Sequence, residues 1–188
     1  MKQAQGQLDI LVTIARLLDR HHIPFLLSGS IAVSFWGYPR ATHDIDFVLE
    51  LSQDQKHELQ KTLSTLSRDF LQDVSDLTHE TTFYSLYYSP ISLKVDLWFE
   101  GKQDFQREWG RRRRVTMQGV SVSLVSAEDL ILTKLSWCKK VWSDRHFRDC
   151  VGMWLVQKGK LDEKYLSDQA KKVGVASLLS QVIATKEY

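Results

Sequence analysis

The chain has 188 residues, of which 43% are hydrophobic and 26% are charged. This is the balance of an ordinary globular protein, and it excludes a disordered chain. The 25 basic residues nearly cancel the 23 acidic ones, leaving a net charge of +2. The composition therefore does not indicate a protein coated in positive charge to hold a long nucleic acid.

Cysteine content and hydropathy predict a reduced, cytoplasmic protein. The two cysteines, Cys138 and Cys150, are too few for a disulfide scaffold. The amino terminus lacks the apolar segment of a secretory signal. The longest uncharged stretch, residues 23–39, contains prolines and glycines and is shorter than the ~20 apolar residues of a membrane-spanning helix. We therefore expect no membrane partner.

The first part of the chain predicts alternating helices and strands. Helical spacing of apolar residues indicates an amphipathic first helix, and a short apolar run indicates a buried strand before the turn Ser28-Gly29-Ser30. In chain order, the expected elements are helix 8–20, strand 24–27, helix 31–36, strand 44–51 and helix 53–67.

Two hairpins and a helical tail follow. The short connections predict antiparallel pairs of strands at 82–88 with 93–99 and at 115–117 with 120–125. Ser126 is a typical N-cap residue for the next helix. The four tail helices are expected at residues 126–140, 144–157, 162–173 and 175–186. The sequence thus predicts an α+β core over residues 1–125 and a helical subdomain over residues 126–188, packed on the core.

Two aspartates interrupt the strand expected at residues 44–51. Asp44 and Asp46 are two positions apart, so the period of a strand places both on one face, while Ile45 and Phe47 point to the core. Two carboxylates so close repel each other unless a cation lies between them. A divalent cation with oxygen ligands is the simplest compensation.

A third aspartate, Asp96, interrupts the later strand at residues 93–99. If this strand lies beside the first with matching faces, three carboxylates converge and suit two Mg²⁺ ions about 4 Å apart. The bland alternative is that Asp44 caps a loop, Asp46 lies on a solvated strand edge, and Asp96 pairs with Lys94 or an arginine. Upstream, the Gly29-Ser30 turn offers free N–H groups and a hydroxyl to a phosphate.

Three motifs together resemble the nucleotidyltransferases of the polymerase-beta type: Gly29-Ser30, the pair Asp44-Ile45-Asp46, and Asp96 on a separate strand. The fuller string at residues 29–46 is similar to the minimal bacterial and archaeal branch that includes the AbiEii-type toxins. Many relatives have Gly-Gly where this chain has Gly-Ser. The helical half of the branch is matched by residues 128–135, 143–149 and 161–175.

The resemblance implies a mixed sheet flanked by helices and followed by a helical bundle. It implies that Asp44 and Asp46 bind both metal ions, and that Asp96 helps to hold the ion that activates the acceptor hydroxyl. The cofactor would be two Mg²⁺ ions, with Mn²⁺ as a substitute. The residues that would bind or support the nucleotide are Gly29, Ser30, Arg40, Thr42, Lys134, Arg145 and Asp149.

The function expected from this resemblance is Mg²⁺-dependent transfer of a nucleoside monophosphate from an NTP to a hydroxyl. The acceptor is left open between tRNA, a protein and a small metabolite, and the family analogy points to the toxin of a toxin–antitoxin pair. The alternative is a non-catalytic relative that binds a nucleotide or a partner as an antitoxin or scaffold. A third hypothesis is that the arginine run at residues 111–114 binds RNA. The alternative is that these arginines are solvated residues at the start of a strand.

Overall fold

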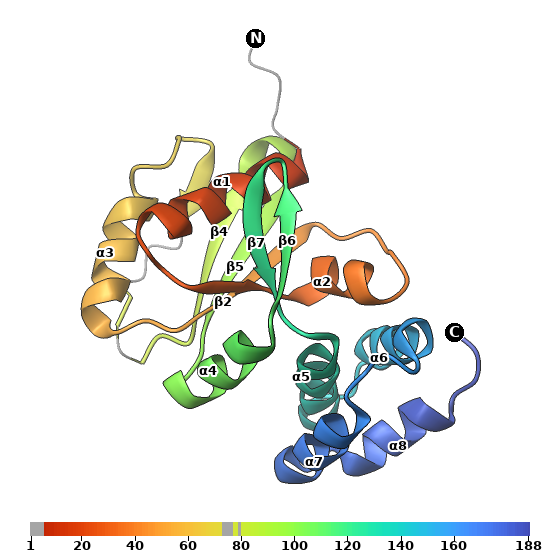
Figure 1. Ribbon diagram of the computed structural model, residues 1–188. Coiled ribbons are helices and arrows are strands. Elements are labelled where there is room, and N and C mark those ends of the chain that lie inside the picture. Colours follow the sequence, from red (N-terminus) through yellow and green to blue (C-terminus); the bar gives the residue numbers. More distant parts are fainter. Residues whose placement is uncertain (1–5, 73–76, 79) are drawn as a thin grey trace. The chain divides into compact units, whose positions relative to one another are not determined.

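The computed structural model describes residues 6–72, 77, 78 and 80–188, which fold into two compact units (Figure 1). The sheet unit runs to Ser30 and resumes with Thr42–Leu124. The helical unit consists of Ile31–Ala41 and Val125–Tyr188. The segment Ile31–Ala41 therefore belongs with the tail helices, although the sequence-based division at residue 125, which stays a prediction, places it in the core.

One seven-stranded mixed sheet forms the centre of the sheet unit in the described part of the chain, with the strand order β3-β4-β5-β2-β1-β7-β6. The strands β2 and β5 are parallel, as are β1 and β7, and the other neighbours are antiparallel. The bounds are β1 Phe25–Leu27, β2 Asp44–Leu49, β3 Phe70–Gln72, β4 Phe83–Tyr88, β5 Leu93–Phe99, β6 Arg113–Met117 and β7 Val120–Leu124. Both predicted hairpins and the predicted α+β fold class are confirmed.

Three helices belong wholly to the sheet unit, and α2 starts in it. Ile10, Leu11 and Ile14 form the buried stripe of α1, as the helical spacing predicts. In α3, the Ser52 hydroxyl accepts from the backbone N–H of Gln55, whose side chain accepts from the N–H of Ser52, which is a capping box. The helices are α1 Gln7–Arg20, α2 Gly29–Trp36, α3 Gln53–Leu63 and α4 Lys102–Arg111.

The alternation of side chains along β2 gives the sheet two different faces. Ile45, Phe47 and Leu49 are buried on one face, where the rings of Phe25 and Phe47 meet edge to face at 5.5 Å. Helix α3 covers this face, with the Lys56 ammonium over the ring of Phe99. The apolar residues fix the register of β2, because a slip of one residue would bury its aspartates instead.

The helical unit has its own apolar core. Ala32 and Val33 from α2 are buried against residues of the tail helices, including Ile131, Leu135 and Trp154. The indole N–H of Trp36 donates to the carbonyl of Val125 at 2.9 Å, and its carbonyl accepts from Gln157 at 2.7 Å. The tail helices are α5 Ala127–Lys140, α6 Asp144–Gln157, α7 Glu163–Val173 and α8 Ala176–Ala184.

Local signals set the helix ends in this unit. Ser126, Ser143 and Asp162 each accept a hydrogen bond from the backbone N–H three residues later, and thereby satisfy an N–H that has no partner within the helix. Gly174 ends α7 with φ of 72°, a conformation that glycine adopts without strain.

The two cysteines are free and buried, which agrees with the expected reduced state. Burial raises the pKa of both the Cys138 and the Cys150 thiols, so neither is activated as a nucleophile. In residues 6–72, 77, 78 and 80–188, we find no helix with the length and hydropathy of a membrane span.

Candidate active site

The register between β2 and β5 brings the predicted carboxylates together. Asp46 lies directly opposite Asp96, and Asp44 lies directly opposite Lys94. Facing residues on paired strands share one face of the sheet, about 4.8 Å apart, and positions two apart along a strand are about 6.6 Å apart. Asp44, Asp46, Asp96 and Lys94 therefore occupy the four corners of a small rectangle. The prediction that the two aspartate-bearing strands lie side by side with matching faces is confirmed.

Asp96 is the most enclosed of the three acids. It is 6% exposed. The Ser85 hydroxyl donates to its Oδ1 at 2.7 Å, and the Lys94 ammonium lies 3.0 Å from its Oδ2. Ser85 reaches it because β4 pairs with β5 so that Ser85 faces Asp96. A buried carboxylate needs such partners, because leaving one unsatisfied costs about 1–3 kcal/mol or more. The pairing of Asp96 with Lys94 that the alternative interpretation named is thus present.

Asp46 lies against the Gly29-Ser30 turn. Gly29 has φ of +61°, and a Cβ atom at this position would lie 1.8 Å from Asp46 Oδ2. The Asp46 carbonyl accepts from the Ser28 N–H at 2.9 Å, and its Oδ1 accepts from the indole N–H of Trp98 at 3.2 Å. The turn approaches the carboxylate this closely because residue 29 has no side chain. Because β2 lies between β1 and β5, Asp46 is not on a strand edge.

Thr42 holds the start of β2. Its hydroxyl accepts from the Asp44 backbone N–H at 3.2 Å, and its carbonyl accepts from the Gln7 side chain at 3.2 Å. Gln7 is in the first turn of α1, so this contact joins α1 to the strand that carries the acid pair. Thr42 therefore supports Asp44 through the backbone, and its role in nucleotide binding stays a prediction.

The face that carries the acids continues into a small apolar cluster. Leu26, Val48 and Phe105 are buried there, and Trp98 and Trp109 pack against them. Helix α4, which supplies Phe105 and Trp109, covers this part of the face. Trp98 thus joins the two regions, because its ring belongs to the apolar cluster while its N–H holds Asp46.

The donor set fits a hard divalent cation, since it consists of three carboxylates on one face of two adjacent strands. Within the described residues, however, no three His, Cys, Asp or Glu side chains are grouped so as to hold a metal ion. Asp96 is turned to Ser85 and Lys94, and Asp46 is turned to Trp98 and Gly29. Binding a cation therefore requires carboxylate oxygens to exchange partners.

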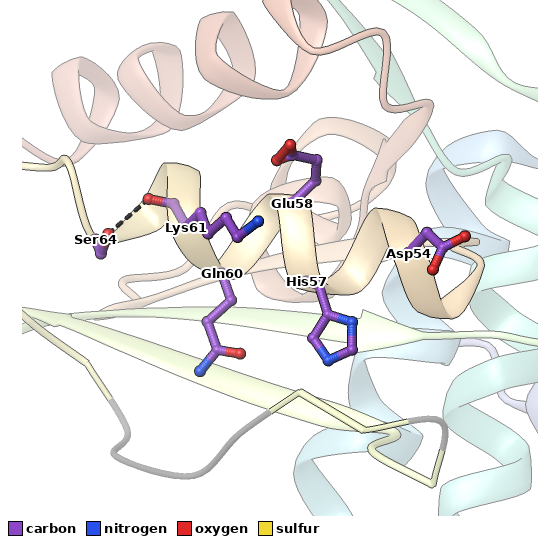
Figure 2. A pocket seen from close by; sticks show the side chains of 6 residues that line it. All are labelled: Asp54, His57, Glu58, Gln60, Lys61 and Ser64. Carbon is purple, nitrogen blue, oxygen red and sulfur yellow. Dashed lines mark hydrogen bonds between the residues drawn. The ribbon is translucent and has the colours of Figure 1, made fainter.

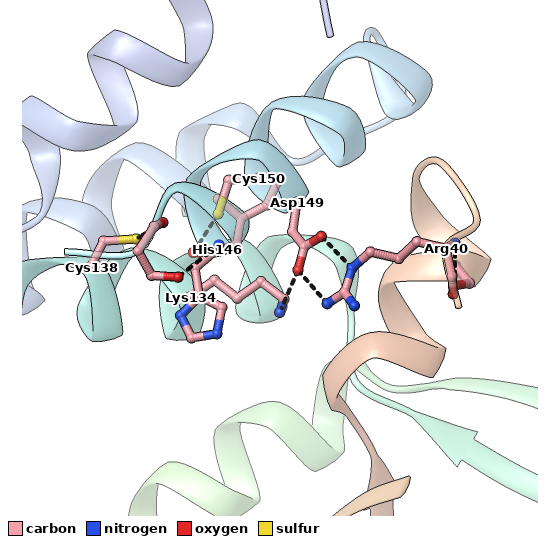
Figure 3. A network of polar contacts seen from close by, with 9 residues as sticks. Arg40, Lys134, Cys138, His146, Asp149 and Cys150 are labelled. Atoms are coloured by element: carbon pink, nitrogen blue, oxygen red, sulfur yellow. Dashed lines mark hydrogen bonds and ion pairs between the residues drawn. The ribbon is translucent and has the colours of Figure 1, made fainter. Parts of the chain in front are cut away.

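A second polar group lies inside the helical unit and centres on Asp149 (Figure 3). Arg40 donates to both oxygens of Asp149, at 2.9 Å from Nε and 3.0 Å from Nη2. The Lys134 ammonium lies 2.9 Å from Asp149 Oδ2. Burial acts to raise the pKa of Asp149, but the hydrogen bond from Arg40 and the charge of Lys134 outweigh it and lower the pKa.

In this arrangement Asp149 holds two cations, and its predicted contact with a nucleotide stays a prediction. Its side chain is 1% exposed, and that of Lys134 is 7% exposed. Two cations share one carboxylate, so the group has one positive charge in excess. Burial lowers the pKa of the neighbouring His146, as do the charges of Lys134, Arg145 and Arg40, which favours its neutral form.

A cavity of about 460 Å³ opens beside this group within the helical unit. Arg145 and Arg148 lie at the start of α6 and have exposed side chains. Cations at the amino end of a helix are unfavourable for its dipole, so their contribution is not to helix stability. The cavity is lined by Arg40, Asp144, Arg145, Arg148, Asp149 and Tyr188.

A larger cavity, of about 710 Å³, runs along α3 in the sheet unit (Figure 2). Its lining comes from one helix surface and contains none of the residues predicted to act in the site. The lining residues are Asp54, His57, Glu58, Gln60, Lys61 and Ser64.

The arginine run is divided between two elements. Arg111 ends α4, Arg112 stacks on the Trp109 ring at 3.9 Å from its centroid, and Arg113 and Arg114 begin β6 with exposed side chains. The run is therefore shared by the end of a helix and the start of a strand, and its proposed contact with RNA stays a prediction.

Comparison with protein families decides the identity. Residues 7–179 match the family described as "Nucleotidyl transferase of unknown function (DUF2204)". The chain belongs to this family. It is therefore an enzyme of the nucleotidyltransferase class, whose members transfer a nucleoside monophosphate. A comparison with curated proteins found no match. The narrower AbiEii-like assignment stays a prediction.

Solved structures agree on the fold. The antigenic nucleotidyltransferase-like protein from Paracoccidioides brasiliensis is 17% identical, with a TM-score of 0.55 over 96% of this nucleotidyltransferase and 94% of that chain. ANT(2″)-Ia in complex with adenylyl-2″-tobramycin is 14% identical, with a TM-score of 0.59 over 94% and 99%. Lincomycin-bound LnuA, a lincosamide antibiotic adenylyltransferase, is 14% identical, with a TM-score of 0.53 over 78% and 95%. At these identities the likeness shows the fold alone.

Several residues of the site were not predicted from the sequence. Ser85 and Trp98 hold the acids only because of the strand register, which a single sequence does not reveal. Lys94 is different, because the alternative interpretation named it as a partner of Asp96, and it lies two residues before Asp96 and therefore shares its face.

Proposed function

We propose that this nucleotidyltransferase transfers a nucleoside monophosphate from an NTP to a hydroxyl at the polar face of β2 and β5. The observation that carries the proposal is the register that sets Asp46 opposite Asp96 beside the Gly29 turn. Carboxylates on one sheet face, next to backbone N–H groups at a helix start, match the needs of a metal-bound triphosphate.

The proposed cofactor is Mg²⁺, held by Asp44, Asp46 and Asp96. When bound, it neutralises charge on the phosphates and favours an ionised acceptor hydroxyl. The residues of this chain supply the positioning: Trp98 and Ser85 orient the acids. Since the transfer needs little covalent chemistry from the protein, orientation and charge are the main contributions.

Each unit contains residues that the resemblance assigns to phosphate binding. In the sheet unit, Gly29 and Ser30 offer N–H groups at the start of α2. In the helical unit, Arg40, Lys134 and Arg145 supply positive charge, with Asp149 holding Arg40 and Lys134 in place. The excess positive charge of this second group favours an anionic ligand.

The acceptor is proposed to be a hydroxyl of tRNA, a protein or a small molecule. ANT(2″)-Ia and LnuA bind a tobramycin adduct and lincomycin, which makes small molecules worth testing here. A role as the toxin of a toxin–antitoxin pair rests on the resemblance to the AbiEii branch. Growth arrest on induced expression that is absent with Asp46→Asn would support that role.

The test is incubation of the purified protein with each α-labelled NTP, Mg²⁺ and one acceptor class at a time. Bulk tRNA, the protein itself and a panel of hydroxyl-bearing antibiotics serve as acceptors. We expect a labelled product that Asp46→Asn abolishes and that Asp168→Asn, an exposed change on α7, leaves unchanged. NTP binding without any product would favour the non-catalytic nucleotide-binding alternative.

A further inference from the structure

Lys94 occupies the fourth corner of the rectangle formed with Asp44, Asp46 and Asp96. The backbone register fixes this position, because Lys94 is paired with Asp44 across the strands and shares the face of Asp96 along β5. Its ammonium lies 3.0 Å from Asp96 Oδ2 and 5.1 Å from the centroid of the Phe83 ring. A permanent positive charge is therefore built into the carboxylate face.

The lysine changes the charge that the face offers to metal ions. Three ionised aspartates and one ammonium have a net charge of −2, which one divalent cation neutralises. A second divalent cation would be repelled by the ammonium as well as by the first ion. Three aspartates without a lysine would leave a charge that favours a second ion.

Asp96 is also the acid least able to accept a metal ion. Its Oδ1 is engaged by the Ser85 hydroxyl and its Oδ2 by Lys94, and its side chain is 8% exposed. Asp44 and Asp46 are only half-buried, so more of their surface is accessible than that of Asp96. The acid pair on β2 is therefore the part of the face best suited to a cation.

We propose that Lys94 takes the place of one of the two divalent ions, so that the face binds a single cation, mainly through Asp44 and Asp46. This inference rests on the proposed function, because it concerns the same carboxylate face. Lys94 then acts as a resident counter-ion for Asp96, and the one-cation state differs from the two Mg²⁺ ions that the sequence resemblance implies.

The experiment is a titration of the purified, full-length protein with Mn²⁺, with free Mn²⁺ measured by electron paramagnetic resonance. We expect one bound Mn²⁺ per chain in the wild type and in Lys94→Arg, which keeps the charge. We expect two in Lys94→Met, which has a similar length without the charge. Lys102→Met, an exposed change in the same unit, should behave as the wild type. Circular dichroism melting curves identify any variant that does not fold.

The outcomes separate this inference from the proposed function. Two Mn²⁺ ions in the wild type, or one in both wild type and Lys94→Met, would overturn the role of Lys94 and leave the transfer proposal standing. Asp46→Asn should lose the wild-type ion. If no variant and no wild-type protein binds Mn²⁺ at this face, both proposals fail.

Discussion

Gly29 and Asp46 approach so closely that a Cβ atom on residue 29 would lie 1.8 Å from Asp46 Oδ2. This contact joins the turn that we propose to bind phosphate to the acid pair, and the positive φ of Gly29 is unfavourable for any other residue. The turn and the carboxylate are therefore positioned by each other, and neither can change without displacing the other.

Gly29→Ala is expected to abolish nucleotidyl transfer and to lower the free energy of unfolding by about 1–3 kcal/mol, because the methyl group displaces Asp46 and the backbone is strained. Urea unfolding and the labelled-NTP assay measure the two effects. Gly110→Ala is the matched control, since no atom lies within 4 Å of its added Cβ and its φ is not positive. An active Gly29→Ala enzyme would contradict the placement of the turn in the site.

Asp149→Asn is expected to destabilise the protein by about 3 kcal/mol, because it removes the buried carboxylate that holds both the Lys134 ammonium and the Arg40 guanidinium. Chemical unfolding monitored by tryptophan fluorescence gives the number. Asp168→Asn on the exposed side of α7 should change stability by less than about 0.5 kcal/mol. Equal stability of the two variants would show that the contacts of Asp149 with Arg40 and Lys134 do not contribute to the free energy of unfolding.

Asp149 also makes the stability of the folded protein depend on pH. The pKa of Asp149 in the folded protein lies below its ordinary value of 3.8, so the unfolded chain binds this proton more readily than the folded one. The stabilisation by ionised Asp149 is therefore complete above about pH 4 and is lost as the pH falls through the folded-state pKa. The stability difference between wild type and Asp149→Asn should shrink on acidification below pH 4, in a series of urea titrations. A difference that grows in acid would contradict the assignment.

Replacing both Arg145 and Arg148 with alanine is expected to raise KM for the NTP about tenfold with little change in kcat, because we propose that these exposed arginines bind phosphate and take no part in the chemical step. Steady-state kinetics at low and high salt test this, and the effect should be smaller at high salt. Lys164→Ala with Lys171→Ala removes the same charge from exposed positions on α7 and should leave KM unchanged. A loss of kcat alone would instead indicate a role in the chemical step.

Strong periodicity explains which elements the sequence could predict. In β2, the alternation of Asp44 and Asp46 with Ile45 and Phe47 specifies both a strand and its two faces. Residues 102–111 have only Phe105 and Trp109 as large apolar residues, so the helix α4 was not predicted. The three-residue strand β3, Phe70–Gln72, is too short for a periodic signal. The predicted helix at 53–67 ends at Leu63 in the structure.

Long-range pairing explains the rest of the site. The sequence predicts that Asp44 and Asp46 share a face, but the partners Ser85 and Trp98 depend on which strands are neighbours. The local sequence pattern also does not show that Ala32 and Val33 pack with the tail helices, because apolar residues would fit either core. The contacts of Asp149 with Arg40 and Lys134 could not be predicted for the same reason, because these residues are far apart in the chain.

The helical unit is discontinuous in sequence, since it draws Ile31–Ala41 from the middle of the first half of the chain. A deletion after residue 124 would consequently remove the surroundings of Ala32 and Val33 and leave these apolar side chains bare. Residues 125–188 therefore cannot be deleted or exchanged, in evolution or by protein engineering, without residues 31–41. A chimeric protein with a different C-terminal segment also needs a segment at residues 31–41 that packs against it.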